Sequence, residues 1–146
     1  MAVYTQISQK EISSIQSNFN LEKIVNFKGI KQGIENTNYF LITKKNKYVL
    51  TIFEKRVKKS ELTFFMKLMD KLNHKGISCP RPLKNKKGNY LFKLKNKLAC
   101  ISTIVEGKDK KNFLIFINLQ RKIFVMQQQI DKLLLKILHQ NVINFL

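Results

Sequence analysis

The segment best suited to chemistry is residues 27–42, FKGIKQGIENTNYFLI, which lies between two predicted strands. Gly29 and Gly33 stand four residues apart and are followed by Asn36 and Asn38. Glycines let the backbone approach a bound group, and exposed backbone N–H groups in such a turn form a concave anion site. The spacing does not fit G-x-G-x-x-G, and no G-K-[ST] follows, so a Walker-type phosphate loop is excluded. An ordinary glycine-containing connection between strands is the alternative interpretation.

The elements that must position this segment can be predicted from hydrophobic periodicity and end signals. The S-Q-K-E sequence beginning at Ser8 is a capping box, and Ser60 is a suitable N-cap for a second helix, with Gly76 just past its end. The predicted elements are a helix from Ser8 to about residue 19, strands over 21–27, 39–43 and 48–53, a helix from Ser60 to about 75, and strands over 89–94 and 98–105. This order predicts an α+β fold with an antiparallel five-stranded sheet and a packed helix.

Six stretches resemble the N-terminal part of bacterial homoserine kinases of the aminoglycoside-phosphotransferase type, which have a protein-kinase-like fold. The resemblance covers residues 1 to about 111, in the family's order and at similar spacing. The stretches are MAVYT (1–5), FKGIKQGIENTNYFL (27–41), YVLTIFEKRV (48–57), LTFFMKLMDKL (62–72), GISCPRPL (76–83) and IVEG (104–107). The resemblance implies ATP-dependent phosphorylation of the hydroxyl of homoserine, with Mg²⁺ expected for the intact family.

The resemblance also implies a set of nucleotide-binding residues. They are Gly29, Gly33, Asn36, Asn38, Thr51, Lys55, Ile104, Val105 and Glu106. The first four would cover the ATP phosphates, and the backbone of the last three would bind adenine. The third strand of the wider fold normally offers a cation to the phosphates. Thr51 stands at that position, as is common in this family, so the charge would come from Lys55 or Lys28.

The second predicted helix should supply an acid that orients this cation. Glu61 and Asp70 are the candidates, and a solvated helix surface is the alternative interpretation of both. Catalysis in this fold further needs an Asp followed five residues later by an Asn that binds Mg²⁺. Beyond Glu106 only Asp109 and Asp131 occur, and neither is followed by Asn at that spacing. We therefore predict no catalytic residue in this chain and no turnover by the chain alone.

The sequence predicts two regions. Residues 1–107 form the kinase-like N-terminal, nucleotide-binding lobe, and residues 108–146 form a helical or disordered tail that the family resemblance does not include. The hypothesis for residues 113–146 is an out-of-frame segment, because the resemblance stops at the A-rich codons expected for residues 110–112. The expected partner is ATP, and homoserine would bind only if the large lobe is present.

Composition leaves one alternative function open. The net charge of +19 suggests a small basic module that binds nucleic acid. However, only three of the 28 basic residues are Arg, and the lysines are spread along the chain, so nucleic acid is not the expected partner. A lobe that binds nucleotide without turnover is a further alternative. Two cysteines without metal-ligand spacing, and no apolar stretch long enough to cross a bilayer, predict a cytoplasmic protein without a membrane partner.

Overall fold

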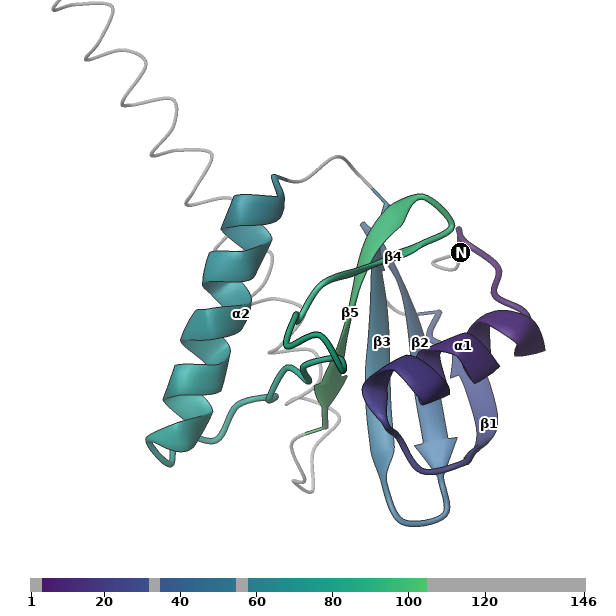
Figure 1. Cartoon of the computed structure of the whole chain (residues 1–146), viewed down its shortest axis with the longest axis horizontal. Helices are drawn as coiled ribbons and strands as arrows, with labels where there is room; N and C mark the ends of the chain where they lie inside the picture. The colour runs from purple at the N-terminus through teal and green to yellow at the C-terminus, as the bar shows by residue number, and fades with distance from the viewer. Residues whose placement is uncertain (1–3, 32–34, 55–57, 105–146) are drawn as a thin grey trace, which may run out of the picture. The chain divides into compact units, whose positions relative to one another are not determined.

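The computed structural model describes residues 4–31, 35–54 and 58–104. The chain divides after Glu106 into two units, and all described residues belong to the first, Met1–Glu106. The described elements, in chain order, are α1 (Gln9–Phe19), β1 (Ile24–Gly29), β2 (Asn36–Thr43), β3 (Lys47–Phe53), α2 (Lys59–His74), β4 (Phe92–Leu94) and β5 (Lys97–Thr103), as Figure 1 shows. The predicted tail, residues 108–146, lies outside the described residues.

The five described strands form one sheet in the order β1-β2-β3-β5-β4, and every pair of neighbours is antiparallel. The predicted five-stranded antiparallel sheet is therefore confirmed. Only β5 is out of sequential order, because it lies between β3 and β4. This central position explains the burial of β5, where four consecutive residues, Ala99 to Ser102, are buried.

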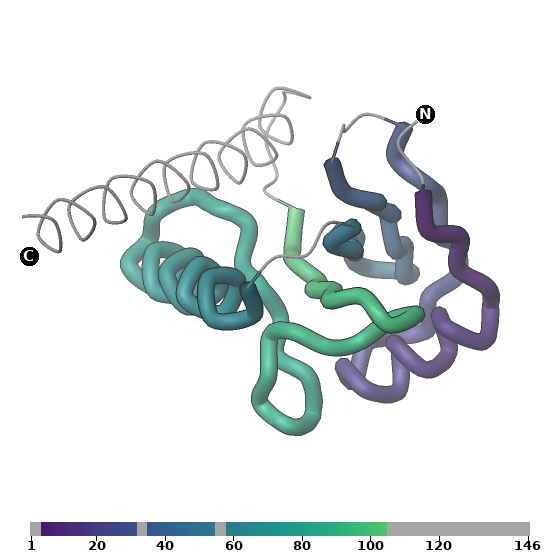
Figure 2. The backbone as a smooth tube through the Cα atoms, turned by 90° about the horizontal axis from the view of Figure 1, so that it is seen from above, coloured from purple at the N-terminus to yellow at the C-terminus, as the bar shows by residue number. Residues whose placement is uncertain are grey.

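One face of the sheet carries the hydrophobic core. Ile12, Ile15 and Phe19 lie on one side of α1 at helical spacing, and they pack against sheet residues such as Leu41 and Leu50. Figure 1 shows α1 crossing the β1 and β2 region of the sheet, and Figure 2 shows α2 on the other side of the unit, beyond β5. The core thus fixes β2 and β3, the two strands that carry the candidate site.

The predicted helix ends are confirmed for α1 and corrected for α2. The Glu11 carboxylate accepts the Ser8 backbone N–H at 2.6 Å, as the capping box requires. The prediction that Ser60 is the N-cap of α2 is wrong, because the helix already begins at Lys59, and the Leu62 N–H donates to the Lys58 carbonyl. Ser60 therefore lies in the first turn. Gly76, with a φ of 79°, follows the helix end as predicted.

Three strands begin three residues away from the predicted start, and the other two differ by one residue. β1 begins at Ile24 instead of residue 21, because the end of α1 still engages this stretch: the Leu21 and Ile24 N–H groups donate to Gln16. β4 begins at Phe92 instead of residue 89, because Asn85 and Asn89 close a turn there. β2 begins at Asn36, three residues before the predicted start, so the strand includes both asparagines of the candidate segment.

Candidate functional site

The register of β2 and β3 separates two sets of polar side chains. Asn38 pairs with Thr51, and Thr51 pairs with Cys100 of β5. Directly opposed residues in antiparallel strands share a face, and neighbours along a strand point to opposite faces. Asn38, Thr51 and Cys100 therefore form a row on the face opposite to the core that packs on α1. We call this face the outer face.

Asn38 and Thr51 form a buried hydrogen-bonded pair. The Thr51 hydroxyl donates to the Asn38 Oδ1 at 2.8 Å, and the Asn38 Nδ2 donates to the Asn36 carbonyl at 3.3 Å. Both side chains are buried. The pair is neutral, and it fixes the rotamer of the Asn38 amide. At Thr51, where the family resemblance leads us to expect the cation of the wider fold, the chain therefore has a neutral hydroxyl in a buried hydrogen bond.

Two candidates on β1 take different places. Lys28 pairs with Phe40, which lies two residues beyond Asn38 on β2, so Lys28 shares the outer face. It is a candidate cation beside the Asn38–Thr51 pair. Gly29 pairs with Tyr39 as the last residue of β1, so it belongs to the strand and not to the turn.

The remaining candidates lie at the other end of the sheet or outside the described residues. Ile104 follows the end of β5, where Thr103 pairs with Tyr48 at the start of β3. It is separated from the Asn38–Thr51 pair by the length of β5 that follows Cys100. Gly33, Lys55, Val105 and Glu106 lie outside the described residues.

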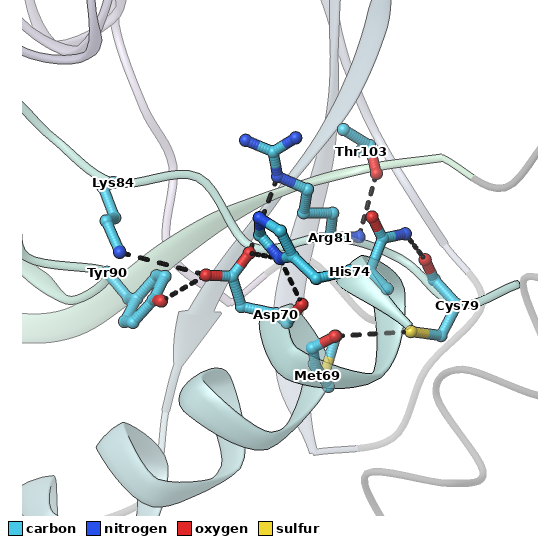
Figure 3. A network of polar contacts seen from close by, with 9 residues as sticks. Met69, Asp70, His74, Cys79, Arg81, Lys84, Tyr90 and Thr103 are labelled. Atoms are coloured by element: carbon cyan, nitrogen blue, oxygen red, sulfur yellow. Dashed lines mark hydrogen bonds and ion pairs between the residues drawn. The ribbon is translucent and has the colours of Figure 1, made fainter. Parts of the chain in front are cut away.

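The partners found for the two candidate acids of α2 lie outside the outer-face row. Glu61 forms an ion pair at 3.4 Å with Lys58, the residue directly before α2. Asp70 instead anchors the segment that follows α2 (Figure 3). Its Oδ2 accepts the Tyr90 hydroxyl at 2.6 Å, and its Oδ1 lies 3.6 Å from the Arg81 guanidinium. The Asp70 side chain is only 15% exposed, so the alternative of a solvated surface does not apply to it.

Figure 3 shows that this network joins α2 to the connector leading to β4. The Asn73 amide donates to the Cys79 carbonyl. The connector then contacts β5: the Thr103 N–H donates to the Arg81 carbonyl, and the Arg81 N–H donates to the Thr103 hydroxyl. Burial raises the pKa of the Tyr90 phenol, and its hydrogen bond to Asp70 raises that pKa further. The phenol thus stays a donor, and Asp70 has a structural role.

A second polar cluster, absent from the sequence-based candidates, lies on the core face beside Asn36 and Asn38. Its members are Thr5, Thr37, Glu54 and Lys97, which we call the Glu54 cluster. The Glu54 carboxylate accepts hydrogen bonds from both threonine hydroxyls and from the Lys97 ammonium. Burial by itself raises the pKa of Glu54, but the hydrogen bonds from Lys97, Thr37 and Thr5 outweigh it and lower that pKa. The carboxylate is therefore held ionised.

Three further features of the described part of the chain concern metal binding, membrane spanning and cysteine reactivity. Within it, no three His, Cys, Asp or Glu side chains gather as a metal site would require. Neither described helix is long and apolar enough to cross a bilayer. Burial raises the pKa of the Cys100 thiol to about 12, so this cysteine of the outer-face row is not a nucleophile.

Comparison with known protein families identifies the class of protein. Residues 26–114, more than half of the chain, match the phosphotransferase enzyme family known as APH. The chain belongs to this family. The match includes most of β1 and all of β2 to β5, and therefore the whole outer-face row.

The curated relatives are more specific. The chain is 42% identical over 107 residues to a homoserine kinase of Parvibaculum lavamentivorans, and 41% identical over 107 residues to one of Agrobacterium fabrum. Each alignment covers 73% of this chain and 33% of the relative. The chain thus spans about a third of the length of these homoserine kinases and is homologous to their N-terminal portion.

The fold has a counterpart among solved structures. A crystal structure of a spectinomycin phosphotransferase in complex with ADP and spectinomycin matches with a TM-score of 0.56 at 13% identity. The match covers 72% of this chain and 32% of that protein. The described unit therefore has the N-terminal lobe fold of these kinases, and the resemblance inferred from the sequence is confirmed at the level of family and fold.

Proposed function

We propose that residues 1–107 form the nucleotide-binding lobe of an ATP-dependent homoserine kinase, an enzyme that makes O-phospho-L-homoserine on the route to threonine. The carrying observation is that Asn38, Thr51 and Lys28 share the outer face of the sheet beside the segment that connects β1 and β2. Family membership and the names of the relatives support the kinase assignment.

The proposed nucleotide lies along the strands on the outer face. Its phosphates meet the Asn36–Asn38 stretch of β2, where the buried Thr51 hydroxyl holds the Asn38 amide, and Lys28 or Lys55 supplies the cation that Thr51 does not. Its adenine meets the backbone from Ile104 to Glu106. Thr51 pairs with Cys100, and Ile104, directly after the end of β5, is four residues further along the chain. At about 3.3 Å per residue, the proposed phosphate and adenine positions are therefore about 13 Å apart. An extended nucleotide fits this separation better than a compact one.

Nucleotide binding and turnover separate in this proposal. Beyond Glu106 neither Asp109 nor Asp131 is followed five residues later by Asn, so the chain carries no recognisable group to accept the hydroxyl proton or hold Mg²⁺. The bound nucleotide would bring Mg²⁺ with it, and homoserine would bind only with a large lobe present. We therefore expect the chain to bind ATP without forming ADP.

Titration calorimetry of the full chain with ATP tests the proposal. We expect ATP to bind. We expect Asn38→Asp to weaken binding about ten-fold or more, because the new carboxylate would repel the phosphates: even at a separation of about 8 Å, two like charges repel by about 2 kcal/mol at an effective dielectric constant of about 20. Asn20→Asp is the matched control, since Asn20 is exposed at the end of α1, which packs on the core face. Lys28→Met should weaken binding and Lys23→Met, at an exposed position before β1, should not. Absence of ATP binding, or equal losses in the controls, refutes the proposal.

A further inference from the structure

The Glu54 cluster joins four segments that are distant in sequence. Thr5 belongs to the N-terminal segment, Thr37 to β2, Glu54 directly follows β3, and Lys97 begins β5. Extending the β3–β5 register by two residues places Lys97 opposite Glu54. The ends of three strands and the N-terminal segment therefore meet at one carboxylate.

The hydrogen bonds of the cluster form a closed network. The Thr37 hydroxyl accepts the backbone N–H groups of Tyr4 and Thr5 at 2.9 and 3.0 Å and donates to Glu54. The Thr5 hydroxyl accepts from the Lys97 ammonium at 2.8 Å and donates to Glu54 at 2.6 Å. Thr37 is completely buried, and the Glu54 side chain is 12% exposed. A buried network with all members satisfied holds its side chains in one arrangement.

Thr37 connects this network to the proposed site. It stands between Asn36 and Asn38 on β2, and its side chain points to the core face while theirs point to the outer face. A strand residue that is fixed on one face fixes the backbone orientation of its two neighbours. The direction of the Asn38 amide on the outer face is therefore coupled to the Thr37 hydroxyl on the core face.

We propose that Glu54 is a positioning residue for nucleotide binding: with Lys97 and Thr5 it holds Thr37, and through Thr37 it sets the Asn36–Asn38 stretch that would contact the phosphates. The inference rests on the proposed function. Glu54 directly follows β3 and binds Thr37 of β2, so this carboxylate joins the end of β3 to the start of β2. It touches no nucleotide itself, because it lies on the core face.

Two substitutions break the network without a large change in volume. Glu54→Gln removes the charge that holds Lys97, and Thr37→Val removes the hydroxyl. Thr37→Ser keeps the hydroxyl and is the rescue variant. Glu22→Gln is the matched control, since Glu22 is an exposed carboxylate before β1. All variants are measured well below their melting temperatures, so that loss of folded protein does not contribute.

Two readouts separate positioning from stability. The first is ATP affinity, which we expect to fall about ten-fold for Glu54→Gln and Thr37→Val and to return to within about two-fold for Thr37→Ser; ten-fold corresponds to about 1.4 kcal/mol. The second is the NMR signal of the Asn38 side-chain amide without nucleotide, which we expect to shift in the first two variants and not in Glu22→Gln. A purely structural cluster would lower the melting temperature and leave this signal in place.

The outcomes are distinct for the two proposals. If the wild-type chain binds no ATP, the proposed function fails, and the Asn38 signal alone decides whether Glu54 acts across β2. If ATP binds but neither the affinity nor the Asn38 signal of Glu54→Gln differs from that of Glu22→Gln, the positioning role is refuted. A fall in affinity that Thr37→Ser does not restore also refutes it, because the hydroxyl would then not be the link.

Discussion

Two carboxylates of similar burial, Glu54 and Asp70, hold different parts of the molecule together. Their side chains are 12% and 15% exposed. Glu54 accepts three hydrogen bonds from three separate segments. Asp70 accepts one close hydrogen bond, from Tyr90, and its three basic neighbours lie 3.4 to 3.9 Å away. Burial alone therefore does not determine the role of an acid; the distance and origin of its partners do.

The basic side chains beside Asp70 are also more exposed than that of Lys97. The side chains of His74, Arg81 and Lys84 are 63, 52 and 55% exposed, whereas that of Lys97 is 36% exposed. Exposed ion pairs contribute little because water and salt screen them. The Glu54 cluster should thus hold the strand ends beside the proposed site, while the Asp70 network fastens α2 to its connector chiefly through Tyr90.

The largest effect in this comparison is expected for Glu54→Ala. The substitution leaves two buried threonine hydroxyls and the Lys97 ammonium without their acceptor, so we expect the free energy of unfolding to fall by about 2–3 kcal/mol. Lys97 can turn partly to water, which keeps the loss below that of a fully buried pair. Urea unfolding at pH 7 measures it. A loss smaller than that of Asp70→Ala would reverse the ranking of the two acids.

The next effect concerns which partner of Asp70 matters. We expect Asp70→Ala to cost about 1–2 kcal/mol and Tyr90→Phe alone to cost about 1 kcal/mol, because the phenol makes the one close hydrogen bond. Arg81→Met should cost less than about 0.5 kcal/mol. Double-mutant cycles between Asp70 and each partner give the coupling energies. A larger coupling to Arg81 than to Tyr90 would show that charge, and not the hydrogen bond, fastens the connector.

The pH dependence of stability should reveal the Glu54 cluster. Because the pKa of Glu54 is lowered in the folded chain, its contribution is present above the unfolded pKa of about 4.5 and is lost as the pH falls through the folded value. The Tyr39 phenol, whose pKa is raised by burial and by the charge of Glu54, does not titrate in this range. The difference in unfolding free energy between the wild type and Glu54→Gln should therefore be largest near pH 7 and shrink below about pH 4.5. A difference that does not change with pH would contradict an ionised Glu54; Glu22→Gln is the control.

The same contrast explains what could be predicted from the sequence. Local spacing and backbone chemistry predict the order of the elements, the capping box at Ser8 and the end of α2 just before Gly76. These predictions are confirmed. The placement of Asn38 and Thr51 on one face required the strand register, which the family resemblance suggested only indirectly. The predicted start of β1 was wrong because Gln16 of α1 accepts hydrogen bonds from the Leu21 and Ile24 N–H groups. No local pattern in residues 21–27 indicates these contacts.

The Glu54 cluster could not be predicted for a related reason. Thr5 and Lys97 are separated by 92 positions, and each residue by itself is an ordinary threonine or surface lysine. Only the β3–β5 pairing brings Lys97 opposite Glu54. The nearest sequence signal is that Thr37 and Glu54 both lie in stretches that resemble the homoserine kinases. The structural role of Asp70 was not predicted either, because its position on α2 does not indicate the contact with Tyr90, twenty residues later.

The smallest effect is expected at Glu61, and it calibrates the other two acids. Glu61 pairs at 3.4 Å with Lys58, the N-cap of α2, but the Lys58 side chain is 73% exposed. Pairs of this kind on a helix surface contribute about 0.2–0.5 kcal/mol, so Glu61→Gln should change the free energy of unfolding by no more than that. The change should also diminish in 1 M salt, where surface charges are screened. A loss of unfolding free energy comparable to that of Glu54→Ala would mean that removal of any carboxylate destabilises this strongly basic chain. The distinction between the clustered and the isolated acid would then reflect net charge instead of local contacts.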